Sequence, residues 1–298
     1  MILQSLEQIL EISASNKPKR LIVSSAEELH VLEAVKLAFK NNIISPILVG
    51  NIEKIKNIAS SIDLDLTNIP LISENDPIEA SKRVVSMIKN KEADILMKGM
   101  VSTSILLKAV LDHKIGIKKG KLLSHIAICQ INTYHKLLTV TDAAINIAPN
   151  LEDKIHILSN ALELLHKLGY SNLKIAIVCP VEKENAKIES TVHASKMKQL
   201  NQAGEIKNCI IDGPLALDNI ISKEAAMTKS INSEVAGDAD LILAPNLDSG
   251  NILYKSIIFL ARGYVAAVVS GASVPIVLTS RADSEKSKLY SIALSTII

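Results

Sequence analysis

A lysine and a glycine directly follow an apolar segment, at a place where an anion could bind. The segment ADILMKGMVSTSILL reaches Lys98 after strand-forming residues, and Gly99 allows the backbone to turn. Ser102 or Thr103 can then cap the helix that follows. Free N–H groups, the helix dipole and the Lys98 ammonium together suit an anion such as phosphate. A capped helix beside a solvated lysine would leave the same pattern.

A serine and an arginine follow a second apolar segment near the C-terminus. In VPIVLTSRADSEKS a buried strand is expected to end at Thr279, and Ser280 and Arg281 precede a helix that opens near Asp283 or Ser284. Open α/β sheets bind ligands at the carboxyl ends of their strands. An arginine there can hold phosphate through a bidentate fork that lysine cannot reproduce. In the alternative, Asp283 caps the helix and Arg281 is exposed, and both interpretations can hold together.

A third group of polar and small residues follows the segment DADLILAP. The turn after that segment and the first helical turns contain Asn246, Gly250, Asn251, Tyr254 and Lys255. Asn251 and Lys255 are four residues apart and share one helix face. Such a pair can bind a ligand, although the start of a surface helix accounts for it almost equally well.

The elements that position these residues alternate along most of the chain. Apolar segments without polar alternation are typical of strands buried on both faces of a mainly parallel sheet. We expect strands at 21–24, 46–50, 94–98, 125–130, 137–141, 173–178, 208–212, 241–245, 265–269 and 275–279. We expect helices at 26–40, 78–90, 103–112, 151–168, 186–202, 251–261 and 284–297. The alternation predicts βαβ units in a three-layer α/β/α fold.

Composition excludes several classes of protein. The formal net charge of +2, the absence of Trp and an aromatic content of 2% disfavour a nucleic-acid-binding protein. The longest apolar stretches are far shorter than the ~20 residues of a spanning helix. The N-terminal segment carries Glu7 and Glu11 among its apolar residues, which indicates an amphipathic helix, not a signal peptide, and a cytoplasmic protein.

Common catalytic motifs are absent from the sequence. It contains no G-x-G-x-x-G, complete P-loop, G-x-S-x-G or H-E-x-x-H pattern, so we expect no dedicated metal site. The cysteines Cys129, Cys179 and Cys209 each lie in a strand-like apolar run and are predicted to be small buried hydrophobic residues. Chemistry must therefore depend on anion sites and carboxylates.

Several long motifs, in the same order, resemble the phosphate acetyl/butyryl transferase family, and most closely its butyryltransferase branch. They are LMKGMVST (96–103), TDAAINIAPNLEDK (141–154), DGPLALDN (212–219), AGDADLILAP (236–245), SGNILYK (249–255) and PIVLTSRADSEKSKLYSIAL (275–294). The resemblance runs through most of the chain.

The resemblance implies a two-domain fold like that of isopropylmalate dehydrogenase, with the active site in the cleft and a homodimeric assembly. A chain of 298 residues suits two domains of about 150 residues. We predict a first domain at 1–118 with 273–298 and a second domain at 119–272. The chain is expected to cross from the first to the second near the glycine-marked segment 113–124.

The resemblance also implies the reversible reaction acyl-CoA + phosphate ⇌ acyl phosphate + CoA, with no metal or cofactor. It makes Ser280 and Arg281 part of the active site. Acetyltransferase members carry a catalytic aspartate where this chain has Ser287, so Asp283 or Glu285 is a substitute, and we take Asp283 as the catalytic carboxylate. Because the cysteines are predicted to be buried, we expect direct transfer without an acyl-cysteine intermediate.

Two alternatives compete with the transferase interpretation. A decarboxylating dehydrogenase of the same fold would bind a divalent metal through aspartates, but Asn251 and Lys255 stand where those aspartates would lie. A non-catalytic CoA-binding relative is suggested by Ser287 alone. Retention of the predicted site residues argues against it; they are Lys98, Thr103, Asn251, Lys255, Ser280 and Arg281.

Overall fold

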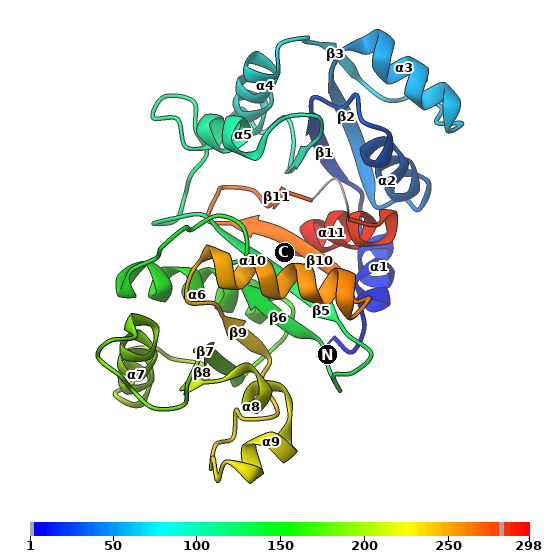
Figure 1. Cartoon of the computed structure of the whole chain (residues 1–298). Helices are drawn as coiled ribbons and strands as arrows, with labels where there is room; N and C mark the ends of the chain where they lie inside the picture. Colours follow the sequence, from blue (N-terminus) through cyan, green and yellow to red (C-terminus); the bar gives the residue numbers. More distant parts are fainter. Residues whose placement is uncertain (1–2, 280–282) are drawn as a thin grey trace. The chain divides into compact units, whose positions relative to one another are not determined.

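The computed structural model of the protein describes residues 3–279 and 283–298. The chain forms two units, and each has a core of mainly parallel strands with helices on both faces (Figure 1). Unit 1 contains Met1–Ser5 and Leu122–Tyr264, and unit 2 contains Leu6–Lys121 and Val265–Ile298. The predicted α/β class is confirmed. The chain passes between units at 5/6, 121/122 and 264/265, whereas the sequence-based division has crossings at 118/119 and 272/273.

Unit 2 is built on strands in the spatial order β3-β2-β1-β4-β11-β10. Neighbouring strands are parallel, except that β10 runs antiparallel to β11. The strands are β1 (Lys19–Ser24), β2 (Ile44–Gly50), β3 (Leu71–Ser73), β4 (Ile95–Lys98), β10 (Tyr264–Ser270) and β11 (Ile276–Val277). In the central strands, residues on both faces are buried, as the apolar runs predict.

The helices of unit 2 form two packed groups. Helices α4 and α5 pack together, whereas α1 and α2 both pack against α11. The helices are α1 (Leu6–Ser15), α2 (Leu29–Lys40), α3 (Ile52–Ser61), α4 (Pro77–Lys89), α5 (Thr103–Val110) and α11 (Glu285–Ile297). The sequence pattern failed to predict α3, because only Ile55 and Ala59 of that helix are buried. It also missed the three-residue strand β3, whose residues are half-buried or exposed.

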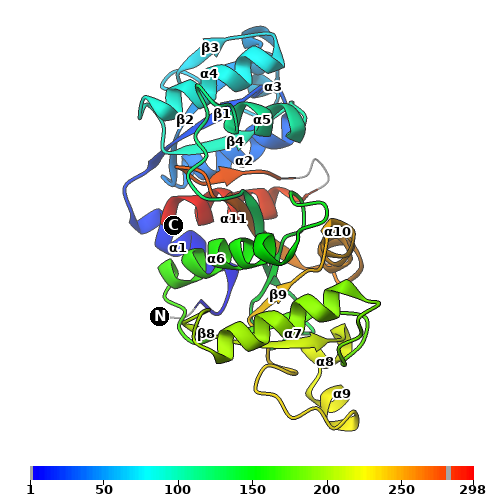
Figure 2. The ribbon, with the colours of Figure 1, turned by 90° about the vertical axis from the view of Figure 1, so that its left-hand side faces the viewer.

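Unit 1 has strands in the order β5-β6-β9-β7-β8, of which only β5 is antiparallel to its neighbour. The strands are β5 (Ser124–Gln130), β6 (Leu138–Thr141), β7 (Leu173–Val178), β8 (Cys209–Leu215) and β9 (Leu241–Leu243). Figure 2 shows α6 and α7 along one side of these strands and α8 and α10 along the other. The helices are α6 (Leu151–Lys167), α7 (Glu189–Gln202), α8 (Leu217–Ile221), α9 (Lys223–Thr228) and α10 (Leu247–Lys255).

Three helices begin three or four residues away from their predicted starts, and one of them is α7, which begins at Glu189 and not at residue 186. Helix α10 begins at Leu247, four residues before the predicted start, because the Asn246 side chain accepts a hydrogen bond from the Ser249 N–H and caps it. A π-helical turn, η1 (Ser256–Leu260), continues α10. Helix α2 begins at Leu29, not at residue 26. In the described ranges, none of the helices is long and apolar enough to cross a membrane.

The first and last helices of unit 2 are joined by buried and polar contacts. Leu6 and Ile9 of α1 are fully buried. The Glu7 carboxylate accepts hydrogen bonds from the Tyr290 hydroxyl at 2.5 Å and the Lys286 ammonium at 3.0 Å. These donors, Tyr290 first, lower the pKa of Glu7 from its usual value of 4.5 to about 2. The ionised carboxylate therefore helps to hold α1 on α11.

We expect Glu7→Gln to lower the free energy of unfolding by about 1 kcal/mol at pH 7, since Glu7 is partly exposed and solvent weakens its interactions. Because the pKa of Glu7 is lower in the folded state than its usual value, the contribution of the Glu7 carboxylate to the free energy of unfolding is complete above pH 4.5. This contribution is lost as the pH falls toward 2. Urea unfolding of both proteins at pH 7 and pH 3 measures this difference. Glu11→Gln on the same helix is the control. A loss that is equal at both pH values would contradict the prediction.

Candidate functional site

In unit 2, the turn after β4 packs tightly against the end of β1. The N–H of Gly99 donates to the Ser24 carbonyl at 2.9 Å, and the N–H of Met100 donates to the Ser25 carbonyl at 2.6 Å. A Cβ on Gly99 would lie 2.2 Å from the Ser25 oxygen, so only glycine fits without a backbone shift. The start of α5 is therefore held at the carboxyl edge of the sheet.

Lys98 is buried in this turn, with 8% of its surface exposed. Its ammonium donates to the carbonyls of Gly99 at 3.1 Å and Val101 at 3.2 Å. The solvated lysine of the alternative interpretation is therefore wrong. Ser102 is the N-cap of α5 and accepts from the Ile105 N–H at 3.3 Å. A buried cation thus lies four residues before the N-cap of a helix, an arrangement that favours a bound anion.

The serine–arginine segment follows the neighbouring strand. Strand β11 is parallel to β4, with Val277 opposite Met97, so the chain after β11 leaves the sheet at the same edge as Lys98. Ser280 and Arg281 lie outside the described residues, and their assignment to the active site stays a prediction.

Asp283 is where the described chain resumes, and 5% of its surface is exposed. It is not the helix cap: Ser284 caps α11 by accepting from the Ser287 N–H at 3.2 Å. The buried Lys288 donates to the Asp283 carbonyl at 2.5 Å. The Ser287 hydroxyl accepts from the Val265 N–H of β10, so this serine has a structural role in place of a base. Asp283 stays the predicted carboxylate.

In unit 1, the turn after β6 wraps around a carboxylate that sequence analysis did not single out. Asp142 is 3% exposed and accepts from the N–H groups of Ala144, Ile145 and Asn146 at 2.8, 3.0 and 3.2 Å. The Asn146 side-chain amide donates to it at 2.5 Å. An aspartate whose carboxylate accepts from the backbone N–H groups two to four residues later forms an Asx-turn. The segment TDAAIN could therefore have been recognised as such a turn from the sequence.

The predicted ligand residues of α10 hold this turn. The Asn251 amide donates to the Ala143 carbonyl at 3.0 Å. Gly250 lies so close to this turn that a Cβ on it would be 2.1 Å from the backbone carbonyl oxygen of Asp142. The buried Tyr254 ring meets His125 edge-on at 5.5 Å, and the Lys255 ammonium lies 5.4 Å from the centre of the Tyr254 ring. This helix face therefore packs within unit 1, and its role as a ligand site stays a prediction.

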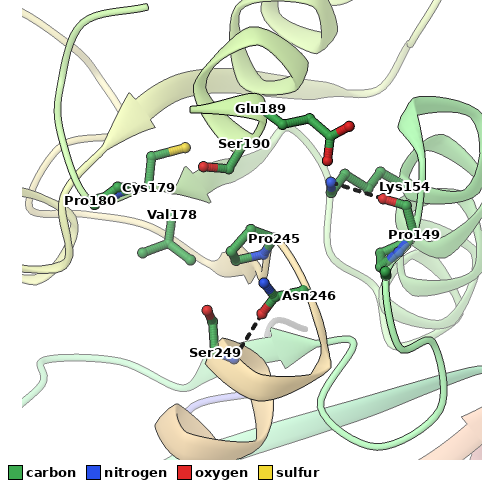
Figure 3. A pocket seen from close by; sticks show the side chains of 11 residues that line it. Pro149, Lys154, Val178, Cys179, Pro180, Glu189, Ser190, Pro245, Asn246 and Ser249 are labelled. Atoms are coloured by element: carbon green, nitrogen blue, oxygen red, sulfur yellow. Dashed lines mark hydrogen bonds between the residues drawn. The ribbon is translucent and has the colours of Figure 1, made fainter. Parts of the chain in front are cut away.

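A cavity of about 510 Å³ opens at the carboxyl ends of β7 and β9 (Figure 3). Its wall includes Cys179 and Pro180 after β7, and Pro245, Asn246 and Ser249 at the start of α10. The first residues of α6 and α7 complete it. Helix starts place N–H groups on the same side as the strand ends, which suits an anionic ligand.

Lys154 of α6 lines this cavity, although only 2% of its surface is exposed. Its ammonium donates to the Pro149 carbonyl at 3.0 Å and lies 2.9 Å from His193 Nδ1. Burial lowers the pKa of Lys154, and burial together with the Lys154 charge lowers the pKa of His193. Neither residue was predicted from the sequence; a lysine four residues into an amphipathic helix is usually solvent-facing, and His193 belongs to no recognisable motif.

The cysteines differ in part from their predicted positions. Cys129 is buried in β5, and burial raises the pKa of its thiol to about 12. Cys209 is only half-buried, and burial raises its pKa to about 11. Cys179 is buried but follows β7 and borders the cavity, and burial raises its pKa as well. None of the three is a ready thiolate at neutral pH.

One group of side chains in the described ranges has metal-ligand spacing. His30 and Glu33 of α2 and Glu285 of α11 place ligand atoms within 4.8 Å of one another. His30 and Glu285 are exposed, and His30 Nδ1 already contacts Glu33 at 2.9 Å. These residues lie in the first two turns of α2 and the first turn of α11, the helices that follow β1 and β11.

These features define an α/β protein whose parallel strands end in turns and helix starts suited to anionic groups. A family model described as phosphate acetyl/butaryl transferase matches residues 5–85 and 79–296. The chain belongs to this family.

Relatives match along nearly the whole chain. A probable phosphate butyryltransferase of Bacillus subtilis is 44% identical over 97% of this chain and 96% of that protein. A phosphate acetyltransferase of Thermotoga maritima is 39% identical over 98% of this chain and 99% of that protein. A crystal structure of a branched-chain phosphotransacylase from Enterococcus faecalis has a TM-score of 0.81 at 30% identity, and covers 94% of this chain and 98% of its own. They support an acyltransferase, not the dehydrogenase alternative.

The contact between α10 and the Asp142 turn yields a stability prediction. Within a helix, Gly→Ala usually stabilises by about 1 kcal/mol, but a Cβ at Gly250 would press on the Asp142 carbonyl. We expect Gly250→Ala to lower the free energy of unfolding by about 2 kcal/mol, as overpacking does. Urea unfolding measures it, with Ser249→Ala on the exposed side of the same helix as control. An increase in the free energy of unfolding of Gly250→Ala would contradict the prediction, because the Asp142 turn would then shift to accept the added Cβ.

Proposed function

We propose that this protein catalyses the reversible transfer of a short acyl group between CoA and inorganic phosphate. The family match over residues 5–296 carries the proposal, because it includes both units and all predicted site segments. Relatives named for acetyl and for butyryl transfer are both similar to this chain. The resemblance to the butyryltransferase branch favours a butyryl group. Homodimer formation and a cytoplasmic location stay predictions.

The phosphate group would bind at the carboxyl edge of the unit 2 sheet. Arg281 would hold it through a bidentate fork, and Ser280 would donate a hydrogen bond. The α5 start contributes helical N–H groups around Thr103, and the nearby Lys98 charge is buried, where it acts more strongly than in water. The same groups would stabilise the negative charge that develops as the acyl group moves, which is usually the largest catalytic contribution.

The CoA thiol would attack an acyl phosphate as a thiolate. A free thiol with a pKa of ~8.5 is only a few per cent ionised at neutral pH, so a carboxylate that accepts its proton raises the reactive fraction. We assign this role to Asp283. Direct transfer, with the C–S bond forming as the C–O bond to phosphate breaks, is supported by the raised thiol pKa values of Cys129, Cys179 and Cys209. An acyl-cysteine intermediate would need a more acidic thiol.

Phosphate-dependent release of CoA from acyl-CoA tests the proposed function. We expect a thiol-reactive dye to report CoA when butyryl-CoA and phosphate are both present, and little CoA when phosphate is left out. Acetyl- and propionyl-CoA in the same assay rank the acyl groups, where one methylene changes the specificity constant by about tenfold to 200-fold. Binding of CoA without phosphate-dependent release would identify a non-catalytic relative.

Arg281→Lys tests the phosphate site. Lysine keeps the charge but loses the planar fork, so we expect turnover to fall by about tenfold or more. Steady-state rates with butyryl-CoA at varied phosphate measure the effect. Arg83→Lys, an exposed position on α4, makes the same chemical change elsewhere and should leave the rate unchanged. Near-normal turnover of Arg281→Lys would remove this arginine from the phosphate site.

A further inference from the structure

A basic cavity of about 590 Å³ lies at the amino-terminal edge of the unit 2 sheet. Arg20 is the second residue of β1, Asp94 precedes β4, and Val274 precedes β11. Strands β1, β4 and β11 are adjacent and parallel, so their amino ends share one edge. Lys98 and Gly99 are at the opposite edge. The cavity is therefore separate from the phosphate site proposed above.

Positive charge is concentrated in this cavity. Its lining carries five cationic side chains and one carboxylate; the cations are Arg20, Lys89, Lys91, Lys118 and Lys119. Asp94 is committed to Arg20, whose Nε and Nη2 donate to it at 3.0 and 2.7 Å. The four lysines of the lining form no ion pair with any residue in the ranges 3–279 and 283–298. Five cations and one carboxylate give the lining a formal charge of +4, whereas the whole chain has a formal net charge of only +2.

In the described part of the chain, the neighbouring acidic side chains Glu92 and Asp112 form no ion pair with these lysines. Glu92 accepts from the Asn90 amide at 3.2 Å. Asp112 accepts from the N–H groups of Lys114 and Ile115 at 2.7 and 3.0 Å. Neither carboxylate lines the cavity. The lysines therefore create a local positive potential that attracts an anion.

The backbone that carries the lysines is held in place. The N–H groups of Lys119 and Gly120 both donate to the Gly271 carbonyl at 2.9 Å, and the Ser273 N–H donates to the Ile117 carbonyl at 2.8 Å. Lys118 forms an antiparallel bridge with Ala272. The Lys89 ammonium donates to the Lys114 carbonyl across the rim. A site whose frame is already ordered loses less entropy when a ligand binds.

The lining indicates which kind of anion fits. It contains no aromatic side chain on which a nucleobase could stack, and its apolar part consists of Ile88, Ala93, Ile117 and Val274. Several lysines around one cavity match a compact ligand with dense charge better than a single phosphate or an extended nucleic-acid strand. We propose that this cavity binds a diphosphate group, recognised through its phosphates, either as inorganic pyrophosphate or as part of a nucleoside diphosphate.

Calorimetric titration of the full chain with sodium pyrophosphate tests the proposal without measuring acyl transfer. Lys91→Gln combined with Lys119→Gln removes two exposed lysines of the cavity. Lys54→Gln combined with Lys56→Gln removes two exposed lysines of α3 and is the matched control. We expect the cavity variant to bind pyrophosphate about tenfold more weakly than the wild type and the control variant, with an affinity that falls as salt rises.

The ligand arms of the same titration identify the source of the diphosphate. ADP that binds no more tightly than pyrophosphate supports recognition of the phosphates alone. Equal affinities of the cavity and control variants would overturn the proposal, because pyrophosphate would then bind elsewhere, including at the phosphate site of unit 2. Orthophosphate that binds the wild type as tightly as pyrophosphate and weakens as much in the cavity variant would also overturn it. So would single-stranded RNA that binds the cavity more tightly than pyrophosphate.

Discussion

The anion-suited edge of unit 2 depends on one close contact, in which the turn after β4 is hydrogen-bonded to the end of β1. The N–H groups of Gly99 and Met100 are bonded to carbonyls at the end of β1, and the space above Gly99 is filled by the Ser25 oxygen. This contact sets the point at which α5 begins and where its N–H groups point. It also turns the Lys98 ammonium inward, onto the carbonyls of its own turn. A bulkier residue at position 99 would move all three features together.

Unit 1 uses a similar close approach to order its own strand edge. Gly250 of α10 rests on the Asp142 carbonyl, and Asn251 bonds to the next carbonyl along. The Asp142 carboxylate in turn collects the N–H groups of the turn beneath the helix. The start of α10 is thereby fixed at the carboxyl end of β9, where Asn246 and Ser249 border the cavity with Lys154. In both units a glycine sets the position of a helix start.

Sequence patterns predicted the strands well because buried apolar runs and parallel order leave few alternatives. They predicted Ser102 as one of two caps and identified the Lys98 turn. They could not show that Lys98 and Lys154 are buried, since burial of an ammonium depends on backbone carbonyls and side chains that lie elsewhere in the fold. Asp283 was a candidate cap, but Ser284 caps α11, and adjacent cap-forming residues cannot be ranked by type. Segments such as β3 and α3 carry too little apolar surface to be recognised.

The discontinuity of unit 2 has a consequence for synthesis on the ribosome. All of Leu122–Tyr264 belongs to unit 1, and apart from Met1–Ser5 that unit is one continuous stretch of chain. Strands β10 and β11 and the helix that receives α1 come only after it. Domains generally fold as units during synthesis, so unit 1 can reach its native structure before α11 has been made. Until then Leu6 and Ile9 of α1 cannot be buried against α11. On the nascent chain, the apolar face of α1 therefore lacks its packing partner until Glu285–Ile297 has been synthesised.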